Sequence, residues 1–295
     1  MIHVALIRRN SMSKEFTKED VIQNKKEAIK SLNNLLESYI NDASSKHLKK
    51  ANLIAYWLKD YVRFIHFEEK FEPTKNIAYK RGNVVKINFG FNIGSEYGGL
   101  HYGIVLDNKN SHNSPVLTII PLTSVKNNKT IHDNSVELGN EIYRSLKLKY
   151  DTISKSLKEE QIEIATTLSA FSSLIERSEK TLSDAMECDK TSVEYLQKID
   201  IVDKYLADAT KLQDIWEKKA KHNKDDLEYL DKIGTEISQM KEGSIALVNQ
   251  ITTVSKLRIF DPRNLKGVLA GISISEESMK KINQKVKQLY VFQEK

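Results

Sequence analysis

The 295-residue sequence contains one cysteine, Cys188, only four prolines and eleven glycines, and no long apolar run. A single cysteine excludes an intramolecular disulfide and a four-cysteine zinc site. A membrane span requires about 18 consecutive apolar residues. The apolar run that opens the sequence is far shorter, and it precedes Arg8 and Arg9 instead of following them, unlike a secretory leader. We therefore expect a cytoplasmic protein without membrane contact.

The composition is that of a folded protein with a modest positive charge. Hydrophobic residues make up 40% of the chain and charged residues 29%, and the formal net charge is +6. Such a composition excludes a disordered chain, and the charge favours a polyanionic partner without establishing one. A chain of this length can bury a substantial core, in one large domain or two smaller ones.

The first part of the chain is predicted to be helical. Neither proline nor glycine occurs from Thr17 to Phe71, and apolar residues recur there at helical spacing. The letters TKED at 17–20 are typical of a helix N-cap, and DASS at 42–45 is typical of a break between two helices. We expect an N-terminal helical region over 1–76.

A second, much longer helical segment is predicted in the middle of the chain. Between 143 and 240, apolar residues step by three and four on both sides of the letters CDKTS. Thr191 and Glu194 have the spacing of a capping box, which predicts a turn at 189–192. Two arms of about 45 residues would form an antiparallel coiled-coil hairpin on the order of 70 Å long.

Strand character appears before and after this hairpin. Short β-branched runs alternate with turns rich in Asn, Ser, Gly and Pro between 81 and 138, which predicts a small, strongly bent antiparallel sheet. Strand character returns after Gly243 in SIALVNQITTV, and an amphipathic helix is expected over 275–290.

The glycine-dense segment between the first strands carries a resemblance to a known family. RGNVVKINFG, followed by IGSEYGGLHYGIVLDNKNSHNSPVLTIIPLTS, resembles the opening half of the MazF/PemK toxin endoribonucleases. The segment GSIALVNQITTVSKLRI at 243–259 resembles the second half of that fold. The matching residues are Arg81, Gly82, Gly94, Ser95, Glu96, Gly98, Gly99, Asn108, Ser114, Pro115, Thr123, Gln250, Ile251 and Thr253.

This resemblance implies an α+β protein built around a small SH3-like, MazF/CcdB-like antiparallel β-barrel. The barrel would consist of 77–142 and 241–295, interrupted by the hairpin over 143–240. The resemblance further implies a homodimer that cuts single-stranded RNA at short sequences without metal or cofactor. It also implies a possible antitoxin that occupies the RNA groove.

The family's catalytic arginine and the proline after it are replaced in this chain by His101 and Tyr102, whereas the family's threonine is kept as Thr123. An imidazole with a pKa near 6.5 suits proton transfer better than a guanidinium does, but it lacks the fork that clamps phosphate. Thr252 stands where the family has a second arginine. We expect His101, Thr123 and Ser124 to be catalytic, and we expect RNA contacts from Lys86, Glu96, Gly98, Gly99, Lys126, Gln250, Lys256 and Arg258.

Other interpretations of the same residues stay open. His101 could be an ordinary packed or solvated histidine, and Thr123 could be an ordinary strand residue. The protein could be a catalytically inactive MazF/CcdB-fold protein that binds nucleic acid or a protein partner, since a shared fold does not fix function. It could also be a scaffold whose hairpin does the work while the barrel dimerises.

Overall fold

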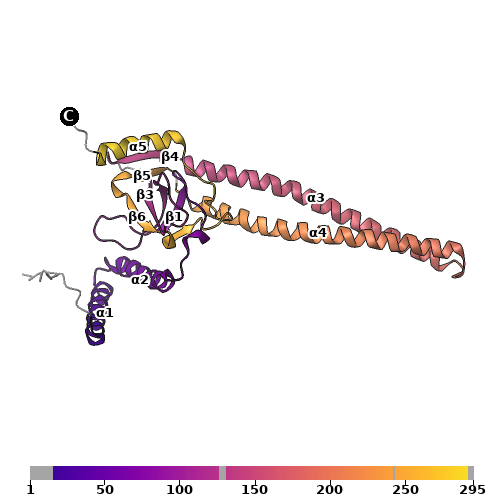
Figure 1. The fold of residues 1–295 in the computed structure, drawn as a ribbon, viewed down its shortest axis with the longest axis horizontal. Coiled ribbons are helices and arrows are strands. Elements are labelled where there is room, and N and C mark those ends of the chain that lie inside the picture. Colours follow the sequence, from indigo (N-terminus) through magenta and orange to yellow (C-terminus); the bar gives the residue numbers. More distant parts are fainter. Residues whose placement is uncertain (1–15, 126–130, 242, 292–295) are drawn as a thin grey trace, which may run out of the picture. The chain divides into compact units, whose positions relative to one another are not determined.

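The computed structural model describes residues 16–125, 131–241 and 243–291 (Figure 1). The chain divides into two compact units, Met1–Phe67 and Glu68–Lys295. None of the helices in the described ranges has an apolar stretch long enough to cross a bilayer.

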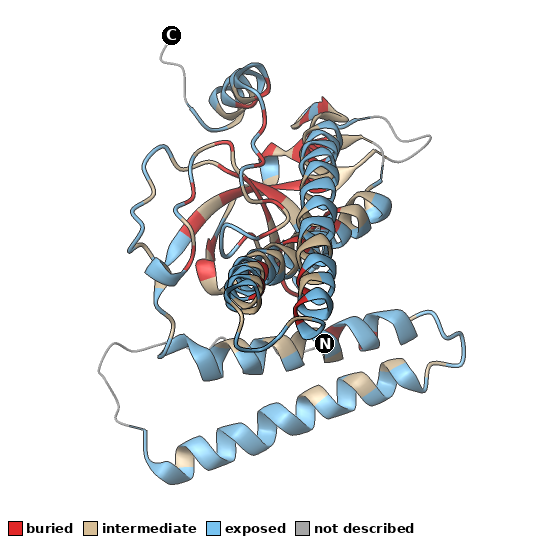
Figure 2. Cartoon of the chain, turned by 90° about the vertical axis from the view of Figure 1, so that its right-hand side faces the viewer, coloured by how far each residue is buried: buried red, intermediate tan, exposed pale blue. Residues whose placement is uncertain are grey.

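The first unit is a pair of helices, α1 (Lys18–Ile40) and α2 (Leu48–Glu68). The Thr17 side chain accepts a hydrogen bond from the Asp20 backbone N–H, and the Asp20 carboxylate accepts one from the Thr17 N–H. This capping box confirms the helix start predicted from TKED. Helix α1 buries none of its residues, and Figure 2 shows it exposed along most of its length.

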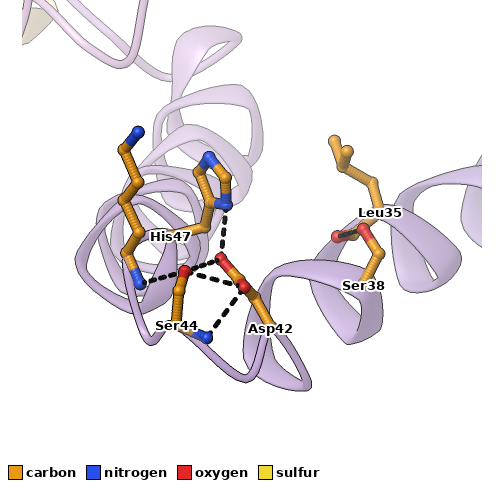
Figure 3. A network of polar contacts seen from close by, with 6 residues as sticks. Leu35, Ser38, Asp42, Ser44 and His47 are labelled. Carbon is orange, nitrogen blue, oxygen red and sulfur yellow. Dashed lines mark hydrogen bonds and ion pairs between the residues drawn. The ribbon is translucent and has the colours of Figure 1, made fainter.

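The turn between the two helices is organised around Asp42 (Figure 3). Its carboxylate accepts hydrogen bonds from the Ser44 backbone N–H at 3.0 Å, from the Ser44 hydroxyl at 2.8 Å and from His47 Nδ1 at 2.8 Å. These bonds, those from Ser44 first, lower the pKa of Asp42. Ser45 follows with a φ of 53°. The predicted break at 42–45 is confirmed.

The second unit contains a seven-stranded sheet in which every described pairing is antiparallel. The strand order is β4-β5-β3-β2-β1-β7, and β6 pairs with β3. Together with the helices, this sheet confirms the predicted α+β class. The strands are β1 (Val84–Asn88), β2 (Leu100–Val105), β3 (Val116–Ser124), β4 (Ser135–Gly139), β5 (Ser244–Leu247), β6 (Thr252–Ser255) and β7 (Ile259–Asp261).

Strand β3 joins the parts of the sheet that precede and follow the hairpin. One of its edges pairs with β2, while the other pairs with β6 along its first half and with β5 along its second half. Strand β7 in turn pairs with β1. The two stretches that resemble the halves of one fold therefore form a single sheet, although the two long helices separate them in sequence.

Each face of the sheet has its own core, because successive strand residues point to opposite sides. One face packs Ile104 and Ile120 against Leu146 of α3, Ile233 of α4 and Ile282 of α5. The other face carries Val85, Ile87, Val105, Leu117 and Ile119, and it is covered by Tyr79, Val254 of β6 and Ile259 of β7. In Figure 2 much of the buried chain, drawn in red, lies in the strands of the sheet.

The predicted hairpin consists of α3 (Glu141–Met186) and α4 (Val193–Gln239), which lie side by side (Figure 1). Its turn falls at the predicted place, but the N-cap of α4 is Ser192, whose hydroxyl accepts from the Tyr195 N–H. The predicted capping box on Thr191 and Glu194 is therefore wrong. Thr191 instead donates its hydroxyl to Asp189 within the turn.

The root of the hairpin is built into the sheet unit. Lys149 of α3 donates through Nζ to the backbone carbonyls of Val268 at 2.9 Å and Ala270 at 2.7 Å. The Glu141 carboxylate accepts from the Ser278 hydroxyl, in the first turn of α5 (Glu276–Tyr290), at 2.6 Å. The hairpin is thus continuous with the core beneath the sheet. Short 3-10 turns at Pro73–Lys75, Val248–Gln250 and Lys256–Arg258 complete the unit.

Candidate active site

His101 and Thr123 lie on the same face of neighbouring strands. Strands β2 and β3 pair as far as Gly103 opposite Pro121, so His101 and Thr123 each lie two residues beyond this last described pair. Both side chains point to the face that carries Val105, because alternate strand residues share a face. Two of the three residues predicted to be catalytic therefore share one face of the sheet.

Tyr97, in the glycine loop before β2, contacts both of these strands. Its ring centroid lies 4.7 Å from that of His101, and its hydroxyl donates to the carbonyl of Leu122, directly before Thr123, at 2.5 Å. The sequence analysis did not single out Tyr97, because the segment was interpreted only through its glycines. An aromatic side chain between Gly94 and Gly98 was the signal that could have identified it.

The surroundings keep both rings neutral at neutral pH. His101 is solvent-exposed as a residue, but its ring rests against Tyr97. Partial desolvation there lowers the pKa of His101, against an opposing hydrogen bond with the Gly98 backbone. Burial raises the pKa of Tyr97 to about 12, against an opposing hydrogen bond with the Thr123 side chain. A neutral imidazole can accept a proton, whereas the phenol stays a donor.

Two of the predicted contact residues, Gly98 and Gly99, close the base of the loop. The Gly99 N–H donates to the Gly90 carbonyl at 2.7 Å, and a Cβ on Gly98 would lie 2.7 Å from the same carbonyl oxygen. Gly99 has a φ of +93°, and its Cβ would lie 3.3 Å from Nε2 of His101. Glycine is therefore required for the turn and for the close approach of the imidazole.

Three further predicted RNA contacts, Glu96, Gln250 and Arg258, line a cleft of about 390 Å³ that Tyr97 also borders. Gln250 accepts from the Tyr97 N–H at 3.3 Å, and Arg258 Nε donates to the Asn88 carbonyl at 2.8 Å. Desolvation lowers the pKa of Arg258. The cleft thus offers carboxylate, amide and guanidinium groups beside Tyr97, whose ring also contacts His101. Within the described ranges, no three His, Cys, Asp or Glu side chains gather as metal ligands.

Other predicted site residues lie elsewhere. Lys86 points to the opposite face of the sheet, where its Nζ lies 2.7 Å from Glu236 of α4, and Tyr102 donates its hydroxyl to the same carboxylate. Ser124 follows Thr123 in β3, so strand alternation directs it to the opposite face. Lys126 lies outside the described residues.

Lys256 is fully buried, although it was predicted to contact RNA. Its Nζ donates to the backbone carbonyls of Ser111 at 3.0 Å and His112 at 3.4 Å, and desolvation lowers its pKa. These bonds tie the loop before β3 to the turn after β6. In this structure the Lys256 ammonium therefore binds backbone carbonyls inside the protein and does not face solvent.

Replacing Lys256 by methionine is expected to lower the free energy of unfolding of the sheet unit by about 2 kcal/mol, because two carbonyls lose their charged donor. The measurement is hydrogen exchange of β1–β3 peptides as urea is raised. Lys204→Met, on the exposed side of α4, is the control and should change stability by less than about 0.5 kcal/mol. Unchanged stability, together with a weaker salt dependence of RNA binding, would instead assign Lys256 to an RNA contact.

Comparison with known families finds a match that covers the first part of the sheet. The family model described as PemK-like, MazF-like toxin of type II toxin-antitoxin system matches residues 80–170. This range holds β1 to β4 and the first part of α3, whereas β5 to β7 lie beyond it and join the sheet by strand pairing. No curated protein matches the chain.

Proposed function

We propose that this chain, in which residues 80–170 match the model of a PemK-like, MazF-like toxin family, is an endoribonuclease toxin with an antitoxin partner. It cuts single-stranded RNA at short sequences in the cytoplasm, without a metal ion. The observation that carries this proposal is the placement of His101 and Thr123 on one face of adjacent strands, with Tyr97 against both strands.

The chemistry follows from the protonation states of the site. The neutral imidazole of His101 takes the proton of a ribose 2′-hydroxyl, and the 2′-oxygen attacks the adjacent phosphorus. The bond from phosphorus to the 5′-oxygen breaks, and that oxygen takes a proton from solvent. The products carry a 2′,3′-cyclic phosphate and a 5′-hydroxyl. The Thr123 hydroxyl donates to a non-bridging phosphate oxygen as negative charge builds up there.

The cleft that Tyr97 borders holds the neighbouring nucleotides. Arg258 provides positive charge for the RNA backbone, while Gln250 and Glu96 provide amide and carboxylate groups for hydrogen bonds. Lys86 adds little to this groove, because it lies on the other face and Glu236 neutralises it. A homodimer is part of the proposal, and sedimentation of the purified protein measures it.

The test is cleavage of a mixed RNA ladder in EDTA, followed by resynthesis of each cut site with a single 2′-deoxynucleotide on the 5′ side of the cut. We expect discrete cuts with cyclic phosphate ends, and we expect the deoxy substrates to stay intact because they lack the nucleophile. Cleavage of the deoxy substrates at an unchanged rate would overturn the mechanism. Intact RNA in every reaction would overturn the enzymatic proposal.

A second candidate function is RNA or protein binding without cleavage. It is favoured by the loss of positive charge at the site, where His101 and Thr252 stand in place of two arginines of the MazF/PemK family that this chain resembles. Binding that persists on RNA that is never cut would support this function. Growth arrest on expression would not separate the two, because either activity could arrest cells.

A further inference from the structure

Tyr97 is held on every side by groups of the candidate site. Its ring lies 5.5 Å from that of Phe89, in an edge-to-face arrangement, and 4.7 Å from that of His101. Its backbone N–H donates to Gln250 at 3.3 Å, and its carbonyl accepts from the Asn92 side chain at 2.7 Å. The ring and both backbone groups of this loop residue are therefore held in place.

The hydroxyl of Tyr97 reaches across to the strand that carries Thr123. It donates to the Leu122 carbonyl at 2.5 Å, and the Thr123 side chain is within hydrogen-bonding reach of it. The peptide group between Leu122 and Thr123 is therefore hydrogen-bonded to the loop that carries Tyr97. A shift of the phenol would therefore affect two contacts at once: the hydrogen bond to the backbone before Thr123 and the packing against the His101 ring.

We propose that Tyr97 is a positioning residue of this site: its ring orients the His101 imidazole, and its hydroxyl fixes the β3 backbone that presents Thr123. This inference rests on the proposed function, which supplies the reaction that the two residues perform. It assigns Tyr97 no proton transfer, since its hydroxyl already donates to a carbonyl within the protein.

The effect of the Tyr97 ring can be measured through the pKa of His101. The residue opposite His101 on β1 is Ile87, and Thr123 lies on the same face of β3; both are uncharged. Among the described contacts of His101, Tyr97 is thus the titratable neighbour. Removing its ring admits water to the imidazole and returns the pKa of His101 upward toward its ordinary value.

The experiment compares Tyr97→Phe and Tyr97→Ala in RNA cleavage and in a histidine-resolved NMR titration of the full chain. Tyr97→Phe should lower kcat about tenfold with little change in KM and leave the His101 midpoint unchanged, because only the hydroxyl is lost. Tyr97→Ala should lower kcat further and raise the His101 midpoint. Tyr79→Phe also removes a hydroxyl that donates to a backbone carbonyl, Pro262, and should change neither quantity.

The outcomes separate this inference from the proposed function. A rise in kcat in Tyr97→Ala would overturn positioning and show instead that the ring blocks the site. An unchanged His101 midpoint in that variant would overturn the packing role. If the parent protein cuts no RNA, the proposed function fails, while the NMR titration and the exchange rate of the Thr123 amide still decide whether Tyr97 holds these two residues.

Discussion

Replacing His101 by alanine is expected to lower RNA cleavage by a factor of about 10²–10⁴, the usual contribution of a positioned general base. Thr123 cannot take over the role, since a hydroxyl is a poor proton acceptor at neutral pH. The fold should survive the change, because His101 is solvent-exposed at the start of β2 and exposed substitutions rarely change stability by more than about 0.5 kcal/mol. The measurement is single-turnover cleavage of one mapped RNA site.

The matched control is His222→Ala, because His222 is an exposed histidine on α4 and not part of the site. It should cleave RNA like the parent protein. Added imidazole should restore part of the activity of His101→Ala, since the lost group is a diffusible base. Loss of less than threefold in His101→Ala would remove this residue from the mechanism and favour the binding function.

The pH dependence of kcat/KM is a second test of His101 as the general base. The pKa of His101 is lowered from 6.5, mainly by desolvation. A general base works in its deprotonated form, so kcat/KM should be constant through neutral pH. It should fall only as the pH drops through a midpoint below 6.5. If the reaction required the imidazolium, kcat/KM would already decline as the pH rises through that same midpoint.

Local signals in the sequence predicted most of the elements, although the helix cap predicted at Thr191 is one residue early. Side-chain pairings between distant residues were not predicted. The capping box at Thr17 and the break at 42–45 depend on residues within a few positions of each other, and both are present. Lys86 is paired with Glu236 across 150 positions, and Lys256 with the carbonyl of Ser111 across 145. No local pattern reveals such partners, so both lysines were taken as available for RNA.

Strand alternation, in contrast, is a local rule that already separates two of the predicted catalytic residues. Thr123 and Ser124 are consecutive in one strand, so their side chains point to opposite faces. The contacts of Tyr97, in contrast, could not be predicted from a local rule. Its glycine neighbours in sequence predict a turn or a mobile loop, and only the folded sheet places its hydroxyl at Leu122, 25 positions away.

Replacing Ile233 by alanine is expected to lower the free energy of unfolding of the sheet unit by about 2–5 kcal/mol, the cost of a large-to-small change in a packed core. Ile233 belongs to α4 yet is fully buried with Leu146, Ile104 and Ile120. The root of the hairpin would then be as necessary to the sheet as the sheet's own strands. The measurement is hydrogen exchange of the β1–β3 peptides as urea is raised.

The control is Ile215→Ala, the same change in the part of α4 further from the root, where the residue is 45% exposed. It should cost less than about 1 kcal/mol, because little apolar surface is buried there. Deleting 164–218 and closing the arms with a short loop should likewise preserve the sheet, since no core residue of the sheet comes from that part of the described chain. Equal losses in Ile233→Ala and Ile215→Ala would contradict this division. The expected result divides the hairpin into a root that stabilises the site's scaffold and a distal part that is free to serve another purpose.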